Sequence, residues 1–172
     1  MTNSGGRSSF GNVGATSRRG VEVSFDWRPL PHTATALKAQ FDQAFLTCTS
    51  APCTQPSVPV AAGNRLPGVP AYSGYAELRW RPGWADWQLE WRAQSKLYVD
   101  DRNTQAAPGY GLVNLAVARS FGAGRTEARA FVRVNNVFDK GYVGSVIVNE
   151  ANGRYYEPAP GRAWLAGLDL SF

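Results

Sequence analysis

The 172-residue sequence is poor in the residue types that carry most enzyme chemistry. It has one histidine and two cysteines, and no run of about 18 apolar residues. The missing apolar run excludes a transmembrane helix. His32 lies in a Pro-Leu-Pro-His turn, and no glycine-rich phosphate loop, Ser/His/Asp set or metal-ligand spacing accompanies it. The sequence therefore predicts no enzyme activity, no metal site and no cofactor.

Nucleic-acid binding is also disfavoured, although the formal net charge is +5. The Lys and Arg residues are scattered singly, and Arg18-Arg19 is their only cluster. No stacked aromatic platform of the kind found in RNA-binding proteins accompanies them. The positive charge is explained at least as well if the basic residues face a barrel lumen, or if they face anionic lipid headgroups at a barrel rim.

The two cysteines, Cys48 and Cys53, stand close together in the segment Cys-Thr-Ser-Ala-Pro-Cys. Such spacing within a polar, proline-containing loop favours a local disulfide in an oxidising compartment over free thiols. A metal site is the least favoured alternative, because the single histidine lies far away in the sequence.

The start of the chain, Met1-Thr-Asn-Ser-Gly-Gly, has neither a basic region nor an apolar one. It is therefore not a signal peptide, which a secreted β-barrel requires. Two interpretations follow. Either the chain is soluble and cytoplasmic, or the true N-terminus of the protein lies elsewhere.

What the chain does have is alternation of apolar and polar residues, with 18 glycines and 11 prolines between the alternating segments. This pattern predicts an all-β, antiparallel up-and-down meander of about seven long strands. After a loop at residues 1–15, the strands are expected near 16–27, 33–46, 71–81, 86–99, 109–121, 126–138 and 161–172.

Each expected strand has one apolar and one polar face. The clearest is 86–99, where Trp87, Leu89, Trp91, Ala93, Leu97 and Val99 alternate with Gln88, Glu90, Arg92, Gln94 and Lys96. The polar faces carry carboxylates and guanidinium groups that we interpret as cross-strand ion pairs on a lumen wall, not as catalytic carboxylates. These are Glu22, Glu77, Glu90 and Glu127, with Arg79, Arg92, Arg129 and Arg133.

The connections between the expected strands alternate between short and long. In a meander this places the short turns at one end of the sheet and the long loops at the other, as in outer-membrane barrels. The expected strand lengths also suit a tilted membrane span. Aromatic residues gather at the short-turn end, as an interfacial girdle would: Trp27, Trp80, Trp87, Phe121 and Phe172. The sequence thus indicates membrane-spanning strands.

Two segments go beyond this pattern. Asn135-Asn136-Val137-Phe138-Asp139-Lys140-Gly141-Tyr142 resembles the Asn-Leu-Phe-Asp-x-x-Tyr signature near the end of TonB-dependent outer-membrane receptors. Glu157-Pro-Ala-Pro-Gly-Arg162 resembles the Pro-Gly-Arg start of their final strand, and Arg19-Gly20-Val21-Glu22 the Arg-Gly-x-Glu start of an earlier one. The resemblance covers essentially the whole chain in a consistent order.

The resemblance implies a bacterial outer-membrane protein that contacts lipid and lipopolysaccharide. It implies that the terminal aromatic residue, Phe172, is the signal read by the barrel-assembly machinery. It also implies uptake of a ferric siderophore or similar nutrient, with energy from TonB acting through a plug domain. Family members have that plug, a TonB box and twenty-two strands, whereas this chain has about seven strands and neither of the others.

The simplest interpretation is therefore that residues 1–172 form a single C-terminal barrel segment of a receptor, from a truncated or split gene or a partial sequence. The reading frame upstream of Met1 would decide this. One alternative is a small outer-membrane pore or adhesin, closed by dimerisation or by an eighth strand from residues 1–12. Another is a soluble β-sandwich binding module, which would bury its apolar face against a second sheet.

Ligand contacts are expected in the long loops and the adjoining lumen mouth, because loops on a rigid scaffold carry binding. The candidates are aromatic side chains, with two arginines for anionic groups. They are Tyr98, Arg102, Tyr110, Tyr142, Arg154, Tyr155 and Tyr156. The alternative for the tyrosines is an outer aromatic girdle.

Overall fold

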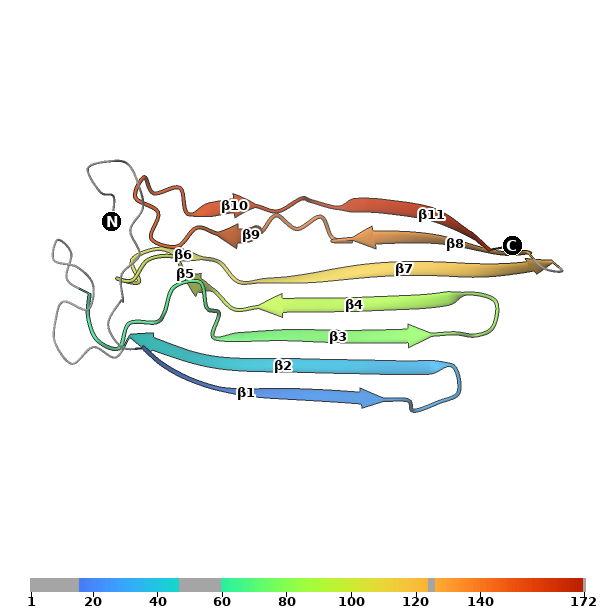
Figure 1. Cartoon of the computed structure of the whole chain (residues 1–172), viewed down its shortest axis with the longest axis horizontal. Helices are drawn as coiled ribbons and strands as arrows, with labels where there is room; N and C mark the ends of the chain where they lie inside the picture. The colour runs from blue at the N-terminus through green and yellow to red at the C-terminus, as the bar shows by residue number, and fades with distance from the viewer. Residues whose placement is uncertain (1–15, 47–59, 124–125, 172) are drawn as a thin grey trace.

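The computed structural model of the chain describes residues 16–46, 60–123 and 126–171, which form strands and their connections (Figure 1). Seven strands make one antiparallel sheet in the order β1-β2-β3-β4-β7-β8-β11. They are β1 (Thr16–Trp27), β2 (Thr33–Leu46), β3 (Tyr72–Trp80), β4 (Asp86–Gln94), β7 (Tyr110–Ala123), β8 (Thr126–Asn135) and β11 (Ala163–Ser171). The predicted all-β meander of about seven long strands is confirmed, and the sheet is open, with β1 and β11 as its edges.

Two small hairpins lie beside the main sheet at its long-loop end (Figure 1). One pairs β5 (Leu97–Tyr98) with β6 (Ala106–Ala107), and the other pairs β9 (Val143–Val146) with β10 (Tyr156–Pro158). The described residues contain no helix that is long and apolar enough to cross a membrane.

The register of the main sheet aligns apolar residues across neighbouring strands. In one row, Leu78, Leu89 and Leu115 lie side by side on β3, β4 and β7, and the row continues to Val134 and Trp164. Because side chains alternate with a period of two, slipping any strand by one residue would turn its apolar set to the opposite face. The alternation in the sequence and the pairing of the strands therefore define the same two faces.

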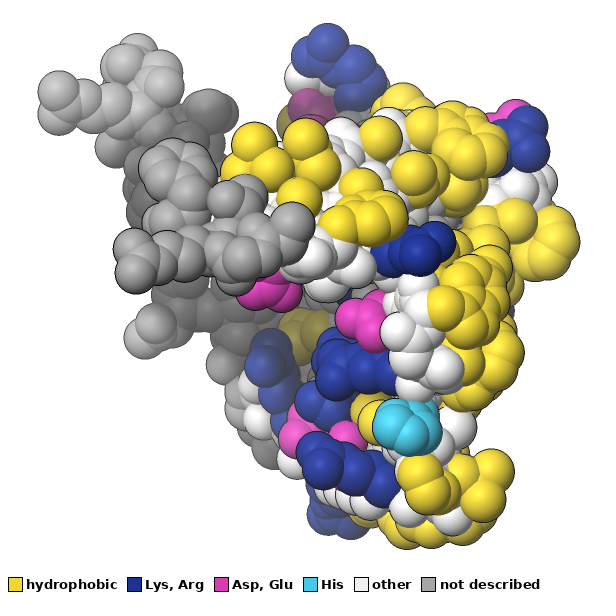
Figure 2. Space-filling view, turned by 90° about the vertical axis from the view of Figure 1, so that its right-hand side faces the viewer, with side chains coloured by type: hydrophobic (Ala, Val, Ile, Leu, Met, Phe, Trp, Pro, Cys, Tyr) yellow, Lys and Arg dark blue, Asp and Glu magenta, His cyan; other side chains and the backbone are white. Residues whose placement is uncertain are grey.

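One face of this curved sheet is apolar and the other is polar. Figure 2, which looks at the short-turn end, shows hydrophobic side chains along the outer margin and most charged side chains inside the curve. On the outer, convex face Leu89 is 44 % exposed, Trp91 45 % and Trp164 70 %. A soluble monomer rarely exposes so large an apolar surface. The main strands form one sheet and not two facing ones, so the β-sandwich alternative does not match.

The inner, concave face is organised around Glu90, which is only 5 % exposed. Its carboxylate accepts hydrogen bonds from Arg133 Nη2, from Asn114 Nδ2 at 3.4 Å and from the Tyr75 hydroxyl at 3.3 Å. Arg92 lies 3.6 Å from the same carboxylate. These partners come from β3, β4, β7 and β8, so one buried charge links four strands. They also supply the compensating contacts that a buried carboxylate requires.

The expected cross-strand ion pairs on the polar face are present in part. Arg133 of β8 pairs with Glu90 of β4, and Arg129 pairs with Asp169 on the neighbouring strand at 3.8 Å. Glu77 instead pairs with Arg79 of its own strand, at 2.6 Å. Within the described segments Glu22 and Glu127 have no ion-pair partner.

The two segments that carry the family resemblance contact each other. Asn136 is buried, and its side chain bonds both the amide and the carbonyl of Lys140, at 2.9 and 2.8 Å. Asp139 then accepts a hydrogen bond from the Arg162 amide at 2.7 Å. A Cβ atom on Gly161 would lie 2.6 Å from Asp139 Oδ1, so any other residue here would displace the carboxylate oxygen that binds the Arg162 amide. The turn after β8 thus fixes the start of β11.

The fourth expected strand, 86–99, is shorter than predicted. β4 ends at Gln94, and the Ser95 hydroxyl accepts hydrogen bonds from the amides of Ala71 and Tyr72. Leu97 and Val99 were expected on the apolar outer face, but they are buried among the loops. The expected loops 100–109 and 139–161 likewise contain β6 and the β9–β10 hairpin.

The two faces predict losses of different size when a positive charge is added. Leu89→Arg places a guanidinium on the convex face, and we expect it to destabilise the membrane-inserted state by about 2–4 kcal/mol. The neighbouring Gln88→Arg places the same charge on the concave face and should change stability by less than about 1 kcal/mol. Denaturant unfolding in lipid vesicles, followed by tryptophan fluorescence, measures both. Equal losses from the two substitutions would contradict the assignment of the faces.

Candidate ligand-binding surface at the long-loop end

The connections at the long-loop end fold against one another. Leu97, Val99 and Ala107 are buried there, at 8, 0 and 2 % exposure, and form a small hydrophobic core. Val143 and Val146 of β9, together with Tyr155, pack against it. Two connections that are far apart in the sequence therefore share one core.

The turn of the β5–β6 hairpin is built around the Asp100 carboxylate, which is buried. It accepts hydrogen bonds from the Thr104 hydroxyl at 2.5 Å and from the amides of Thr104 and Gln105 at 2.8 and 2.9 Å. Burial alone would raise the pKa of the Asp100 carboxyl. These hydrogen bonds, helped by the nearby Arg102 guanidinium, instead hold that pKa below its ordinary value.

The turn of the β9–β10 hairpin has a similar anchor. The Glu150 carboxylate accepts hydrogen bonds from the amides of Asn152 and Arg154 at 2.8 and 2.9 Å. The bond from the Arg154 amide is the main cause that lowers the pKa of Glu150. In both turns a carboxylate thus satisfies backbone donors that the short hairpin leaves unpaired.

Backbone hydrogen bonds tie the two hairpins to each other and to the segment before β3. The Asn149 amide donates to the Val99 carbonyl at 2.9 Å, and the Asp101 amide donates to Asn149 Oδ1 at 3.0 Å. The Gly68 amide donates to the Tyr98 carbonyl at 2.8 Å. These bonds join three connections into one unit, which we call the loop block (residues 60–71, 95–109 and 143–160).

Three of the five candidate tyrosines lie on the loop block. Tyr98 is half-buried, and the Lys96 ammonium lies 5.3 Å from the centre of its ring. Tyr156 is exposed, and its hydroxyl donates to the Ala106 carbonyl at 3.2 Å. Tyr155 packs against the small hydrophobic core, and the centres of the Tyr155 and Tyr156 rings lie 6.2 Å apart. Since Tyr98 pairs with Ala106, all three rings gather around the β5–β6 hairpin.

The other two tyrosines form a separate pair. The rings of Tyr110, at the start of β7, and Tyr142, just before β9, lie 4.6 Å apart at 52°. Both are half-buried, with part of each ring accessible. This pair lies where the main sheet meets the loops.

The two candidate arginines are exposed. Arg102 stands in the turn of the β5–β6 hairpin and Arg154 in the turn of the β9–β10 hairpin. The hydrogen bond between Asp101 and Asn149 brings these turns together. The arrangement offers aromatic faces and guanidinium donors on a pre-organised surface, which suits a ligand with flat and anionic groups.

Several residues that organise this surface were not among the candidates. Asn103 and Asn149 adopt left-handed backbone conformations, with φ of 58° and 54°. Asn103 also bonds the Arg65 backbone in both directions, at 2.7 and 2.9 Å. Asn in polar loops tolerates this conformation, which is the only local signal for these positions.

Cys48, Cys53 and Phe172 lie outside the described residues, so the expected disulfide and assembly signal stay predictions.

A family model and several solved structures match the chain. The model described as "TonB dependent receptor-like, beta-barrel" matches residues 1–137. The ferric citrate transporter FecA, in its unliganded form, aligns with a TM-score of 0.75 and 20 % identity over 90 % of this chain and 24 % of its own. The ferric yersiniabactin uptake receptor FyuA from Yersinia pestis aligns with a TM-score of 0.71 and 21 % identity over 92 % of this chain and 24 % of its own.

The ferric preacinetobactin receptor BauA from Acinetobacter baumannii aligns with a TM-score of 0.71 and 18 % identity, over 91 % of this chain and 22 % of its own. At these identities the likeness concerns the fold. The chain spans less than a quarter of the length of each of these three proteins.

The Asp100 anchor predicts a pH dependence of the loop block. Because the pKa is lower in the folded state, the carboxylate stabilises the hairpin at neutral pH. That stabilisation begins to be lost when the pH falls to about 4, the ordinary pKa of an Asp carboxyl. The loss is complete once the pH has passed below the lower pKa of the folded state. Hydrogen exchange should show the Thr104 and Gln105 amides opening over this range. Asp100→Asn should open them already at pH 7, and unchanged protection in that variant would contradict the account.

Proposed function

The chain belongs to the family of TonB-dependent receptor β-barrels, and on that premise we propose that it is the C-terminal portion of an outer-membrane uptake receptor. The intact receptor would import a ferric siderophore or a similar scarce nutrient. The compartment of the family, and of this chain, is the bacterial outer membrane. Receptors of this family are transporters and not enzymes, and we assign the same role to the intact protein.

The observation that carries the proposal is the shape of the wall. Seven long antiparallel strands present an apolar convex face and a polar concave face, and within the described residues the edge strands β1 and β11 each pair on one side only. Open edges in lipid leave backbone groups unpaired at a cost of several kcal/mol each. A sheet of this kind is stable in a membrane when further strands continue it into a closed barrel. The described strands therefore fit part of a larger barrel wall.

The class of nutrient is inferred from the neighbours. Three of the similar structures are receptors or transporters named for ferric citrate, ferric yersiniabactin and ferric preacinetobactin, and all three ligands are iron chelates. The loop block and the Tyr110–Tyr142 pair would supply part of the binding surface. Their aromatic faces would stack on flat groups of the chelate, and Arg102 and Arg154 would bind its anionic oxygens.

Other parts of the receptor would complete the cycle. Energy from TonB would reach the ligand through a plug domain, which the strands described above do not include. The barrel-assembly machinery would read Phe172 during insertion, and lipid and lipopolysaccharide would contact the convex face. None of these partners requires a catalytic group or a cofactor in this chain.

Deletion of the gene in its native bacterium tests the proposal. On iron-limited medium supplied with single ferric siderophores, we expect the deletion to abolish growth on at least one of them, and plasmid-borne expression to restore it. Inactivation of TonB should give the same loss. Unchanged growth and radioactive-iron uptake on every chelate of the panel would contradict the proposed function.

The aromatic pair predicts a specific loss of ligand affinity. Tyr142→Ala, introduced into the receptor in cells, removes one ring of the pair and should weaken chelate binding about two- to tenfold, as expected for an aromatic contact of about 0.5–1.5 kcal/mol. Tyr72→Ala is the matched control, because Tyr72 is an exposed tyrosine on the convex face at the same end. Binding of the labelled chelate at 4 °C separates affinity from uptake. Equal weakening by both substitutions would argue against a contact at Tyr142.

A further inference from the structure

The convex face carries one isolated positive charge at the short-turn end. In the described strands the register places two charged residues on this face, Arg19 on β1 and Arg119 on β7. Arg19 lies near the long-loop end, where β1 begins at Thr16. Arg119 lies four positions before Ala123, the last residue of β7. The other convex positions of these strands are uncharged, so Arg119 interrupts an apolar surface.

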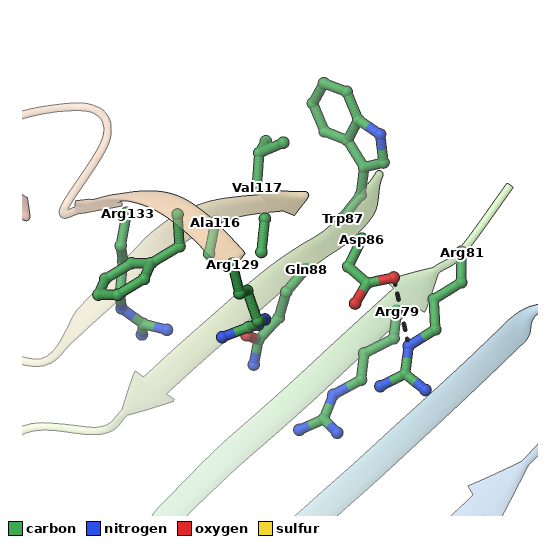
Figure 3. Close-up of a pocket in the computed structure, with 11 residues that line it drawn as sticks. Arg79, Arg81, Asp86, Trp87, Gln88, Ala116, Val117, Arg129 and Arg133 are labelled. Carbon is green, nitrogen blue, oxygen red and sulfur yellow. Dashed lines mark ion pairs between the residues drawn. The ribbon is translucent and has the colours of Figure 1, made fainter. Parts of the chain in front are cut away.

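Arg119 faces the same way as Trp87. Figure 3 shows Trp87 and Val117 pointing to one side of the sheet, and the labelled arginines, among them Arg129, pointing to the other. Val117 and Arg119 lie two positions apart on β7, so their side chains share a face. Because Val117 pairs with Trp87, Arg119 is the diagonal neighbour of Trp87 and lies within reach of its indole ring.

Aromatic rings frame the guanidinium of Arg119. Its Cζ atom lies 5.0 Å from the centre of the Phe121 ring, which is two positions closer to the turn. The side chain therefore extends towards the short-turn end and away from the middle of the strand, as long basic side chains do at a lipid interface. Nearby, Trp84 packs edge-on against Trp87, with the ring centres 5.7 Å apart. Phe121 is 48 % and Trp84 54 % exposed, so these rings border the guanidinium without enclosing it.

No acidic group in the described part of the chain balances this charge. Arg119 is exposed, and no carboxylate of a described residue lies within ion-pair distance of it. The Phe121 ring attracts the cation but offers no hydrogen-bond acceptor for its five N–H donors. A basic residue on the lipid face of a barrel is costly at the bilayer centre and much less so near the interface. The position of Arg119 therefore suits an anion supplied by the membrane interface.

We propose that Arg119, bordered by Phe121, Trp84 and Trp87, binds the phosphate of an anionic phospholipid in the leaflet at the short-turn end. A guanidinium binds phosphate oxygens through two parallel hydrogen bonds. The aromatic rings would pack against the glycerol and the upper acyl chains, since such rings favour sites with one apolar and one wet side. A headgroup with net negative charge balances the guanidinium, whereas the ammonium of a zwitterionic headgroup competes for the same phosphate.

This inference rests on the proposed function in one respect, because it requires that the convex face contacts lipid. It adds a defined site and a preferred lipid charge to that general contact. It concerns the end of the sheet opposite the loop block, and it involves no chelate.

The test uses the protein purified from outer membranes in a mild detergent. Phosphatidylglycerol is the anionic probe and phosphatidylcholine the zwitterionic one. Native mass spectrometry measures the fraction of protein that retains each lipid as the lipid concentration is raised. Arg119→Gln should weaken retention of phosphatidylglycerol about fivefold, as expected for one basic residue at a lipid surface, and leave that of phosphatidylcholine unchanged. Arg119→Lys keeps the charge and should retain most of the affinity for phosphatidylglycerol.

Arg129→Gln is the matched control. Arg129 lies on β8 beside Ser120, the residue next to Arg119, and so at the same height of the wall. Its side chain points to the concave face and lies 3.8 Å from the Asp169 carboxylate (Figure 3). This variant removes the same charge at the same end of the sheet, and it should leave retention of phosphatidylglycerol unchanged.

Three results would overturn the proposal. Unchanged retention of phosphatidylglycerol by Arg119→Gln would reject the site itself. Equal weakening by Arg129→Gln would show attraction to net charge without a defined site. Equal loss of both lipids in Arg119→Gln, or a lysine variant as weak as the glutamine variant, would show lost packing and no phosphate contact. Circular dichroism checks that each variant keeps its strands, and Arg119→Lys keeps the test valid if Arg119→Gln unfolds. Because the assay contains no iron chelate, its failure would leave the uptake proposal standing, and loss of the uptake proposal would leave this lipid assay unaffected.

Discussion

The structure depends on the pairing of backbone groups along one continuous antiparallel ladder. In lipid an unpaired N–H or C=O costs several kcal/mol, so the ladder has to continue without interruption through the membrane. Its register also sets the chemistry of the two faces, because a one-residue slip would turn an apolar row inward. The row from Leu78 through Leu89 and Leu115 to Trp164 shows the same register carried across five strands. Among the described residues β1 and β11 are the edges of this ladder, and under our proposal further strands continue it into a larger barrel.

On the concave face, the same strands carry mainly polar side chains. Glu90 is buried, yet Arg133, Asn114, Tyr75 and Arg92 surround its carboxylate. Breaking such a cluster by removing one partner leaves a buried charge uncompensated. At the long-loop end of this wall, the loop block offers aromatic rings and two exposed arginines.

Alternation along the chain was sufficient to predict the seven strands and their two faces, because each face is set by neighbours in the sequence. The family resemblance, and not the alternation, singled out Asn136, Asp139 and Arg162, and in the structure their hydrogen bonds hold the turn after β8 against the start of β11. Local patterns failed where distant segments meet. Leu97 and Val99 continue the alternation of β4, but the Ser95 hydroxyl bonds the backbone ahead of β3 and the chain turns into the loop core. The tyrosines were expected at the mouth, but their grouping into a trio and a pair depends on hydrogen bonds between hairpins, which no local pattern contains.

The central claim is that the convex face contacts lipid while the concave face contacts water, and cysteine labelling along β4 tests it most directly. In cells whose protein has Cys48 and Cys53 replaced by serine, single cysteines at positions 87, 88, 89, 91 and 92 would be exposed to a membrane-impermeant maleimide. The account predicts labelling at Gln88 and Arg92 and protection at Trp87, Leu89 and Trp91. Uniform labelling of all five positions, or protection that does not follow the two faces, would contradict it.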